Sequence, residues 1–290
     1  MLNALIKTMR PRQWTKNGFI FFALIFDKRL FMPDPFLRTV IGFLLFCLIS
    51  SAVYLFNDIV DVEADRNHPE KKFRPIASGK LPVPVAFASA LLLILIALPL
   101  AYLLSPWFAV VLAVYLANNL LYSRWLKHIS ILDVLIVSAG FVLRVAAGVI
   151  LIYPVERFSP WLYMITILFS LYIGLGKRRA EMNLLADGAT AHRKVFDGYT
   201  IPLLDQYITI VSGTTIVAYS LYTFSAPNLP ANHTMMLTIP FVVYGIFRYL
   251  QLIQTGHAAG SPDEVALRDR PLQITVLLWG VAVIAIFYLS

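Results

Sequence analysis

The sequence has 290 residues, of which 59% are hydrophobic and only 14% are charged. Soluble domains carry about a quarter charged residues, so this composition excludes a soluble domain or a disordered chain and favours a membrane protein with several spans. The net charge of +8 is explained in a membrane protein by loop orientation, anionic lipid or phosphate-bearing substrates, rather than by nucleic acid. The single cysteine, Cys47, excludes a disulfide framework and a cysteine-based metal cluster.

Nine segments of the chain are apolar over a length close to the roughly 20 residues that a helix needs to cross a bilayer. The first is the weakest, because Asp27, Lys28 and Arg29 interrupt it near its far end. We therefore expect an all-α integral membrane protein in which one domain of nine transmembrane helices covers residues 1–290. The predicted spans cover about residues 17–33, 36–58, 83–104, 106–122, 131–153, 160–176, 203–224, 234–252 and 272–289.

The distribution of Lys and Arg predicts the orientation of these spans, because cytoplasmic loops carry an excess of both. With the N-terminus inside the cell, the inner segments carry 18 Lys and Arg residues and the outer segments carry four. This excess favours a cytoplasmic N-terminus. The outer connections are short and nearly uncharged, so we expect an active site that faces the cytoplasm from a cell (inner) membrane.

Acidic residues recur at helical spacing where the second predicted span ends. Tyr54, Asp58, Asp61 and Asp65 lie at positions i, i+4, i+7 and i+11, which is one face of a helix, and Asn57 lies beside them. Three carboxylates on one face repel each other, so they require a cation. Oxygen ligands without His or Cys are typical of Mg²⁺, which is commonly shared with substrate phosphates. The sequence therefore predicts a magnesium site at this membrane boundary.

Basic residues follow the acidic ones directly. Lys71, Lys72 and Arg74 lie in the same segment, and a diphosphate needs both Mg²⁺ and basic groups to neutralise its oxygens. Two alternatives stay open. Lys71 and Lys72 also fit the ordinary excess of positive charge on the inner side, and the acids also fit a solvated helix end paired with these basic residues.

These motifs resemble a known family. Asn57-Asp58-x-x-Asp61-x-x-x-Asp65 is similar to the NDxxDxxxD signature of the UbiA superfamily of intramembrane prenyltransferases, and Arg10-Pro11-x-x-Trp14-x-Lys16-Asn17 also fits this family. The resemblance implies a fold of nine helices around a central cavity. The second acidic motif of the family, DxxxD between spans six and seven, is absent, and Gly176-Lys177-Arg178-Arg179-Ala180-Glu181 stands in its place. This departure argues against a standard aromatic prenyltransferase.

The combined pattern resembles one branch of the superfamily, the decaprenyl-phosphate phosphoribosyltransferases. The resemblance implies transfer of 5-phosphoribose from phosphoribosyl diphosphate (PRPP) to a polyprenyl phosphate, towards arabinose donors for cell-wall polysaccharide. Each matching segment is short, and their order along nearly the whole chain carries the resemblance. Besides those above, the segments are Arg74-Pro75-Ile76-Ala77, Leu126-Lys127-His128 and Ala266-Leu267-Arg268-Asp269-Arg270.

The resemblance also implies roles for basic residues at the inner boundary. Lys127 is expected to contact donor phosphate, whereas Tyr122 fits both a phosphate contact and an ordinary interfacial anchor. Lys177, Arg178 and Arg179 follow the sixth span, where these three residues would bind phosphate oxygens directly in place of a second metal site. Glu181 is expected to pair with one of these cations.

Two further cations have open interpretations. Arg144 lies well inside the fifth predicted span, where a charge is costly and is usually functional or paired. It either meets the phosphate of the acceptor lipid or pairs with Asp133, eleven residues earlier on nearly the same helix face. Lys16, at the mouth of the first span, either contacts donor phosphate or anchors the helix at the interface.

The sequence thus predicts a catalytic membrane domain whose cofactor is Mg²⁺ and whose partners are PRPP, polyprenyl phosphate and membrane lipid. The alternatives are an aromatic prenyltransferase that uses a prenyl diphosphate, and a lipid transporter without chemistry. The polyprenyl chain length, the oligomeric state and the need for the 5-phosphate stay open. The catalytic and metal-binding candidates are Asn57, Asp58, Asp61 and Asp65, and the substrate-binding candidates are Lys16, Tyr54, Lys71, Lys72, Arg74, Tyr122, Lys127, Arg144, Lys177, Arg178 and Glu181.

Overall fold

The computed structural model describes residues 1–68, 70–152, 159–186, 194–227, 229–255 and 268–289. Within these residues every regular element is a helix. Eight of the helices are long and apolar enough to cross a membrane, and they match the second to ninth predicted spans. The chain is therefore a multi-pass membrane protein.

The first predicted span has a different structure from the one expected. Instead of one long α-helix, residues Pro11–Ile20 form the 3-10 helix η1, and Phe21–Phe26 form the short helix α2. A break at Arg10 precedes η1, since Arg10 adopts a left-handed conformation with φ of 53° before Pro11. The predicted total of nine transmembrane helices therefore stays a prediction.

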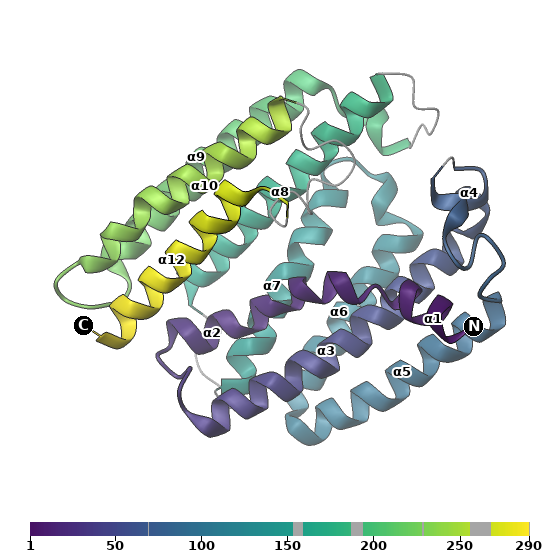
Figure 1. Ribbon diagram of the computed structural model, residues 1–290, viewed down its shortest axis with the longest axis horizontal. Helices are drawn as coiled ribbons and strands as arrows, with labels where there is room; N and C mark the ends of the chain where they lie inside the picture. The colour runs from purple at the N-terminus through teal and green to yellow at the C-terminus, as the bar shows by residue number, and fades with distance from the viewer. Residues whose placement is uncertain (69, 153–158, 187–193, 228, 256–267, 290) are drawn as a thin grey trace. The chain divides into compact units, whose positions relative to one another are not determined.

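The chain divides into two compact units, and unit 1 comprises Met1–Ile25, Arg29–Lys127 and Ala139–Phe158. Its centre is α3, which packs against α5, α6, α1 and η1; Figure 1 shows α3 beside α5. Phe46, Ile49, Phe108 and Leu112 are fully buried in this core. The elements of unit 1 up to α7 are α1 Leu2–Met9, η1, α2 (whose last residue belongs to unit 2), α3 Pro33–Val60, α4 Val62–Arg66, η2 Lys71–Phe73, α5 Val83–Leu104, α6 Pro106–Arg124 and η3 Leu126–His128.

Unit 2 comprises Phe26–Lys28, His128–Ser138 and Ser159–Ser290, and α7 (Leu132–Ile152) begins in it and continues in unit 1. Its core lies between α8, α9 and α10, where Tyr172, Leu204, Ile208 and Ile246 are buried. Figure 1 shows α9 beside α10, and α12 beside α10. The other elements of unit 2 are α8 Pro160–Ala186, η4 Lys194–Gly198, α9 Ile201–Ser225, η5 Thr234–Thr238, α10 Ile239–Gln254 and α12 Arg270–Leu289.

Short polar residues set where several helices begin. Ser105 accepts a hydrogen bond from the Phe108 N–H and precedes Pro106, the first residue of α6. Thr200 accepts one from the Leu203 N–H at the start of α9 in the same way. Such caps satisfy N–H groups that have no partner inside the helix. Proline fits the first turn, where its missing N–H costs nothing.

Candidate active site

The acidic segment lies where α3 passes into α4. Asp61 joins the two helices, and its N–H bonds to the Asn57 carbonyl at 2.9 Å while its own carbonyl accepts from the Asp65 N–H at 2.8 Å. The helical hydrogen bonds therefore continue through the junction. Asp58 and Asp65 lie on one face, as the spacing predicts, and both reach Nη1 of Arg74, at 3.2 and 2.7 Å.

A second arginine reaches the same carboxylate from the N-terminal segment. Arg10 donates from Nη2 to Oδ1 of Asp58 at 2.6 Å, and its guanidinium carbon lies 4.9 Å from the centre of the Tyr54 ring. The sequence did not single out Arg10 as a site residue. The only signal for it was the Arg10-Pro11 pair in the family motif.

The third carboxylate has a different partner. Asp61 accepts a hydrogen bond from Nζ of Lys127 at 2.5 Å. Asn57 accepts one from the hydroxyl of Ser123 at 3.1 Å. Ser123 lies in the last turn of α6 and Lys127 lies in η3 just after it, so the end of α6 and the connection that follows both contact the acidic segment.

Burial makes the pairing of these charges necessary. Asp58 and Asp65 are only 2% and 3% exposed, and an isolated carboxylate in such a place would be very costly. Arg10 and Arg74 retain 29% and 27% exposure of their side chains. The site thus consists of buried acids held by arginines whose side chains are partly exposed.

The donor atoms fit Mg²⁺, although the three predicted carboxylates do not come together. Among the residues that the structure describes, no three His, Cys, Asp or Glu side chains form a group that could hold a metal ion, because Asp61 pairs with Lys127. Asp58 and Asp65, however, converge on a single nitrogen of Arg74, which occupies the place of a cation between two hard oxygen donors. Mg²⁺ is usually bound by one or two carboxylates together with substrate phosphates, so this pair suits it.

A second polar cluster lies in unit 2, around Arg178. Its guanidinium bonds to Asp133 and to Glu181, both at 2.5 Å, which confirms that Glu181 pairs with one of the basic residues. Asp133 is fully buried and also accepts a hydrogen bond from the Tyr199 hydroxyl at 2.7 Å. Arg178 therefore holds two carboxylates, and phosphate binding by it would compete with at least one of them.

The residues beside Arg178 lie on a helix rather than in a loop. α8 continues past the predicted end of the sixth span to Ala186, so Lys177, Arg178 and Arg179 occupy successive helical positions. Arg179 pairs with Asp205 of α9 at 2.5 Å and donates to the side chain of Gln254 at 2.7 Å. Lys177 is half-buried.

The proposed pairing of Arg144 with Asp133 is wrong. Arg144 donates to Oδ1 of Asn17 at 2.9 Å and to the hydroxyl of Tyr115 at 2.8 Å. Its guanidinium also lies over the rings of Tyr115, Phe46 and Phe141. Asp133 is occupied by Arg178 from the neighbouring helix, so the two α7 residues do not pair despite sharing a face. Arg144 of α7 instead contacts η1 through Asn17 and α6 through Tyr115.

The remaining candidates lie near the surface of unit 1. Lys16, Lys71 and Tyr122 are half-buried. Lys72 is exposed, and its ammonium lies 5.3 Å from the centre of the Phe73 ring.

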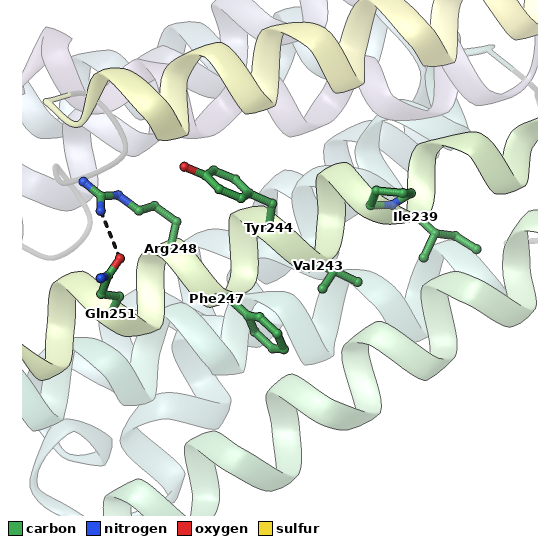
Figure 2. Close-up of a pocket in the computed structure, with 7 residues that line it drawn as sticks. Ile239, Val243, Tyr244, Phe247, Arg248 and Gln251 are labelled. Carbon is green, nitrogen blue, oxygen red and sulfur yellow. Dashed lines mark hydrogen bonds between the residues drawn. The ribbon is translucent and has the colours of Figure 1, made fainter.

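A groove of about 590 Å³ runs along α10, and none of these candidates lines it. Its surface is mostly apolar (Figure 2), and Arg248 marks its polar end by bonding to Gln251 at 2.9 Å and to Asp269 at 2.8 Å. These hydrogen bonds from Arg248 lower the pKa of the Asp269 carboxyl. The lining residues are Ile239, Pro240, Val243, Tyr244, Phe247, Arg248 and Gln251.

Comparison with known proteins gives consistent matches over the whole chain. The sequence matches the UbiA prenyltransferase family over residues 19–263. It is 37% identical to the decaprenyl-phosphate phosphoribosyltransferase of Mycolicibacterium smegmatis, covering 100% of this chain and 94% of that protein. The Corynebacterium glutamicum protein of the same name is 35% identical, with 100% and 88% covered.

Solved structures show the same fold at low sequence identity. A UbiA homolog from Archaeoglobus fulgidus bound to DMAPP and Mg²⁺ superposes with a TM-score of 0.73 at 16% identity, covering 99% of each chain. The same homolog bound to GPP and Mg²⁺ gives a TM-score of 0.72 at 17% identity, covering 98% of this chain and 99% of the other.

Proposed function

The chain belongs to the UbiA prenyltransferase family, and we infer that it transfers 5-phosphoribose from PRPP to a polyprenyl phosphate with release of diphosphate. Full-length relatives in two genera carry the name of this activity. The structural observation that carries the proposal is the convergence of Asp58, Asp65 and Arg74. It brings two carboxylates and a guanidinium together, which supports the proposal because a diphosphate donor requires a metal held by oxygen ligands together with basic groups.

The acidic segment is proposed to hold Mg²⁺ and, with it, the diphosphate of the donor. Asp58 and Asp65 supply the converging oxygen atoms, and Asp61, with Asn57 beside it, completes the set once Lys127 releases it. The bound metal would stabilise the negative charge of the departing diphosphate as a Lewis acid. The solved relatives that carry Mg²⁺ with a diphosphate support this assignment.

The basic residues are proposed to bind the donor phosphates that the metal does not neutralise. Arg74, Lys127 and Lys177 are the principal candidates, with Lys16, Lys71 and Lys72 at the edge of the site. As the bond from C1 of ribose to the diphosphate lengthens, positive charge develops on the sugar ring. The buried carboxylates of Asp58 and Asp65 favour that charge electrostatically.

The acceptor needs little help from the protein in this reaction. A phosphate monoester has a second pKa of about 6, so the polyprenyl phosphate is already largely a dianion at neutral pH. No general base is therefore assigned. The prenyl chain would stay in the bilayer while its phosphate meets the donor at the cytoplasmic boundary of the inner membrane, and the product would feed arabinose donors for cell-wall polysaccharide.

Transfer of labelled 5-phosphoribose from PRPP to polyprenyl phosphate by the purified protein tests this function. We expect labelled lipid with Mg²⁺ and none with a chelator. The same preparation is then given a prenyl diphosphate and an aromatic acid. Prenylated aromatic product without any ribosylated lipid would refute the proposal and favour the aromatic prenyltransferase.

A further inference from the structure

Three aspartates of the α3–α4 segment, Asp58, Asp61 and Asp65, are neutralised by cations that all come from elsewhere in unit 1. None of the partners belongs to α3 or α4, so each pair depends on the fold rather than on neighbouring sequence. The pairs are Arg10 with Asp58, Arg74 with Asp58 and Asp65, and Lys127 with Asp61.

The charges of this group balance as the structure stands. Three carboxylates face three cations, and two of the carboxylates are almost fully buried. Mg²⁺ alone would add two uncompensated positive charges to the group, and a diphosphate alone would add several negative ones. Uncompensated charge in a poorly solvated place is strongly unfavourable. Binding of either ligand by itself is therefore unfavourable, whereas the charges of the two ligands together largely cancel.

The position of Arg74 between Asp58 and Asp65 means that this arginine must move when a metal ion binds. Nη1 of Arg74 lies within hydrogen-bond distance of both Asp58 and Asp65, so a metal ion between these carboxylates takes the place of this nitrogen. Arg10 shares Oδ1 of Asp58 with Arg74 and would also lose this partner. Both arginine side chains are more than a quarter exposed, whereas the carboxylates that they hold are buried, so the arginines are the partners that can move.

We propose that Arg10 and Arg74 are internal counter-ions that leave the carboxylates when Mg²⁺ binds and then hold the diphosphate of the donor. Arg10 thereby becomes a substrate-binding residue of the reaction. The consequence is that metal and diphosphate bind strongly only together. This inference rests on the proposed function, because it takes the donor to be a diphosphate.

The first experiment measures metal binding without any substrate, by the thermal stability of the purified full-length protein in Mg²⁺ alone. Bound Mg²⁺ raises the melting temperature of a protein that binds it in the folded state. We expect little shift for the wild type and a clear shift for Arg74→Gln, since only the guanidinium of Arg10 then has to leave the carboxylates. Arg66→Gln is the matched control, because Arg66 pairs with the exposed Glu63 at 2.8 Å on α4, and it should behave as the wild type.

The second experiment measures the affinity of the purified protein for labelled inorganic diphosphate, with and without Mg²⁺. The wild type should bind it at least about tenfold more tightly with Mg²⁺, within the usual range of coupling between two ligands. Arg10→Gln should lose most of this gain, whereas Arg12→Gln, which alters an exposed neighbour, should keep it. Arg10→Gln also serves as an independent variant if Arg74→Gln does not fold.

Two results would overturn the inference. One is strong Mg²⁺ binding by the wild type that diphosphate does not change, and the other is weaker Mg²⁺ binding by Arg74→Gln than by the wild type. Neither depends on the ribosyl donor. Coupled binding without transfer from PRPP would therefore reject the proposed function and keep the inference, and transfer without coupling would do the reverse.

Discussion

The hydroxyl of Tyr199 holds a strained point of the backbone in unit 2. It accepts a hydrogen bond from the Ile131 N–H at 2.5 Å and donates one to Asp133 at 2.7 Å. Ile131 has a φ of 71°, which is costly for a β-branched residue. Burial, together with the bond to Asp133, raises the pKa of Tyr199 above its ordinary value, so the hydroxyl keeps its proton at neutral pH.

Replacing Tyr199 by Phe should therefore lower the stability of the folded protein. The change leaves the Ile131 N–H and one oxygen of Asp133 without this partner, which costs about 1–3 kcal/mol. Thermal unfolding of the purified protein measures the effect. Tyr102→Phe is the control, because Tyr102 is 62% exposed, and it should melt as the wild type. Equal melting temperatures for all three proteins would contradict this account of Tyr199.

At the residue scale, sequence reasoning succeeds where partners are close along the chain. Asp58 and Asp65 share a face because they are seven positions apart, and Glu181 pairs with Arg178 three positions before it. Arg10 and Asp58 are 48 positions apart, and Asp133 and Arg178 are 45. Such pairs depend on which helices pack together, which a single sequence does not reveal. This is why Arg10 was missed, and why one of the two interpretations of Arg144, its pairing with Asp133, is wrong.

The element that departs most from expectation is η1. A 3-10 helix of ten residues is unusual, because such helices seldom exceed a single turn. Polar contacts hold it on α3, where Trp14 donates to Ser51 at 3.1 Å and Asn17 donates to Ser50 at 3.1 Å. Neither contact is visible in an apolar pattern, which is why the sequence predicted one continuous span here. By contrast, the bounds of α5 were predicted correctly, since Pro82 and Ser105 flank an uninterrupted apolar run.

The packing of η1 on α7 depends on Gly148. A Cβ at this position would overlap the carbonyl oxygen of Ile20 at the end of η1. Gly148→Ala should therefore destabilise the protein by about 1–3 kcal/mol, as overpacking usually does. Gly213→Ala is the matched control on α9, where a Cβ meets nothing within 4 Å, and it should stabilise by about 0.5–1 kcal/mol. Melting temperatures that shift in the same direction for both variants would refute the close approach of η1 and α7.

The link from α10 to α12 should make stability depend on pH. Asp269 bonds to Arg248 and to the Leu272 N–H at the start of α12, and its lowered pKa means that folding favours the charged carboxylate. The contribution is therefore full above the unfolded pKa of about 3.9 and is lost as the pH falls through the lower, folded value.

Asp269→Asn tests this dependence, since Asn keeps a cap for the helix and loses the charge. The variant should melt below the wild type at pH 7, and the difference should shrink as the pH falls below about 4. In the Arg248→Gln background the same substitution should have a smaller effect. A difference that stays constant between pH 7 and pH 3 would show that the ion pair contributes nothing.

At the scale of the whole molecule, composition and apolar segments predicted the membrane class and eight of the spans. The backbone of a chain in lipid must satisfy its own hydrogen bonds, which leaves few alternatives to a helix. The acidic motif predicted a candidate site at the end of α3, and its role in the reaction stays a prediction. What the sequence did not reveal is how the acids are neutralised. Arg10 between α1 and η1, Arg74 after η2 and Lys127 in η3 converge on the acids at the end of α3 and in α4, so the site of unit 1 arises from the fold.

The most direct test of the central claim compares two carboxylates of α4 in the transfer reaction. Asp65 is 3% exposed and holds Arg74, whereas the Glu63 side chain is 79% exposed and pairs with Arg66. Transfer of labelled phosphoribose from PRPP to polyprenyl phosphate is measured for Asp65→Asn and Glu63→Gln, per folded protein. We predict a loss of about 10²-fold or more for Asp65→Asn, the usual cost of removing one electrostatic contact to the reacting charge, and activity close to the wild type for Glu63→Gln. Equal activity of the two variants would contradict the assignment of the buried acids to the reaction.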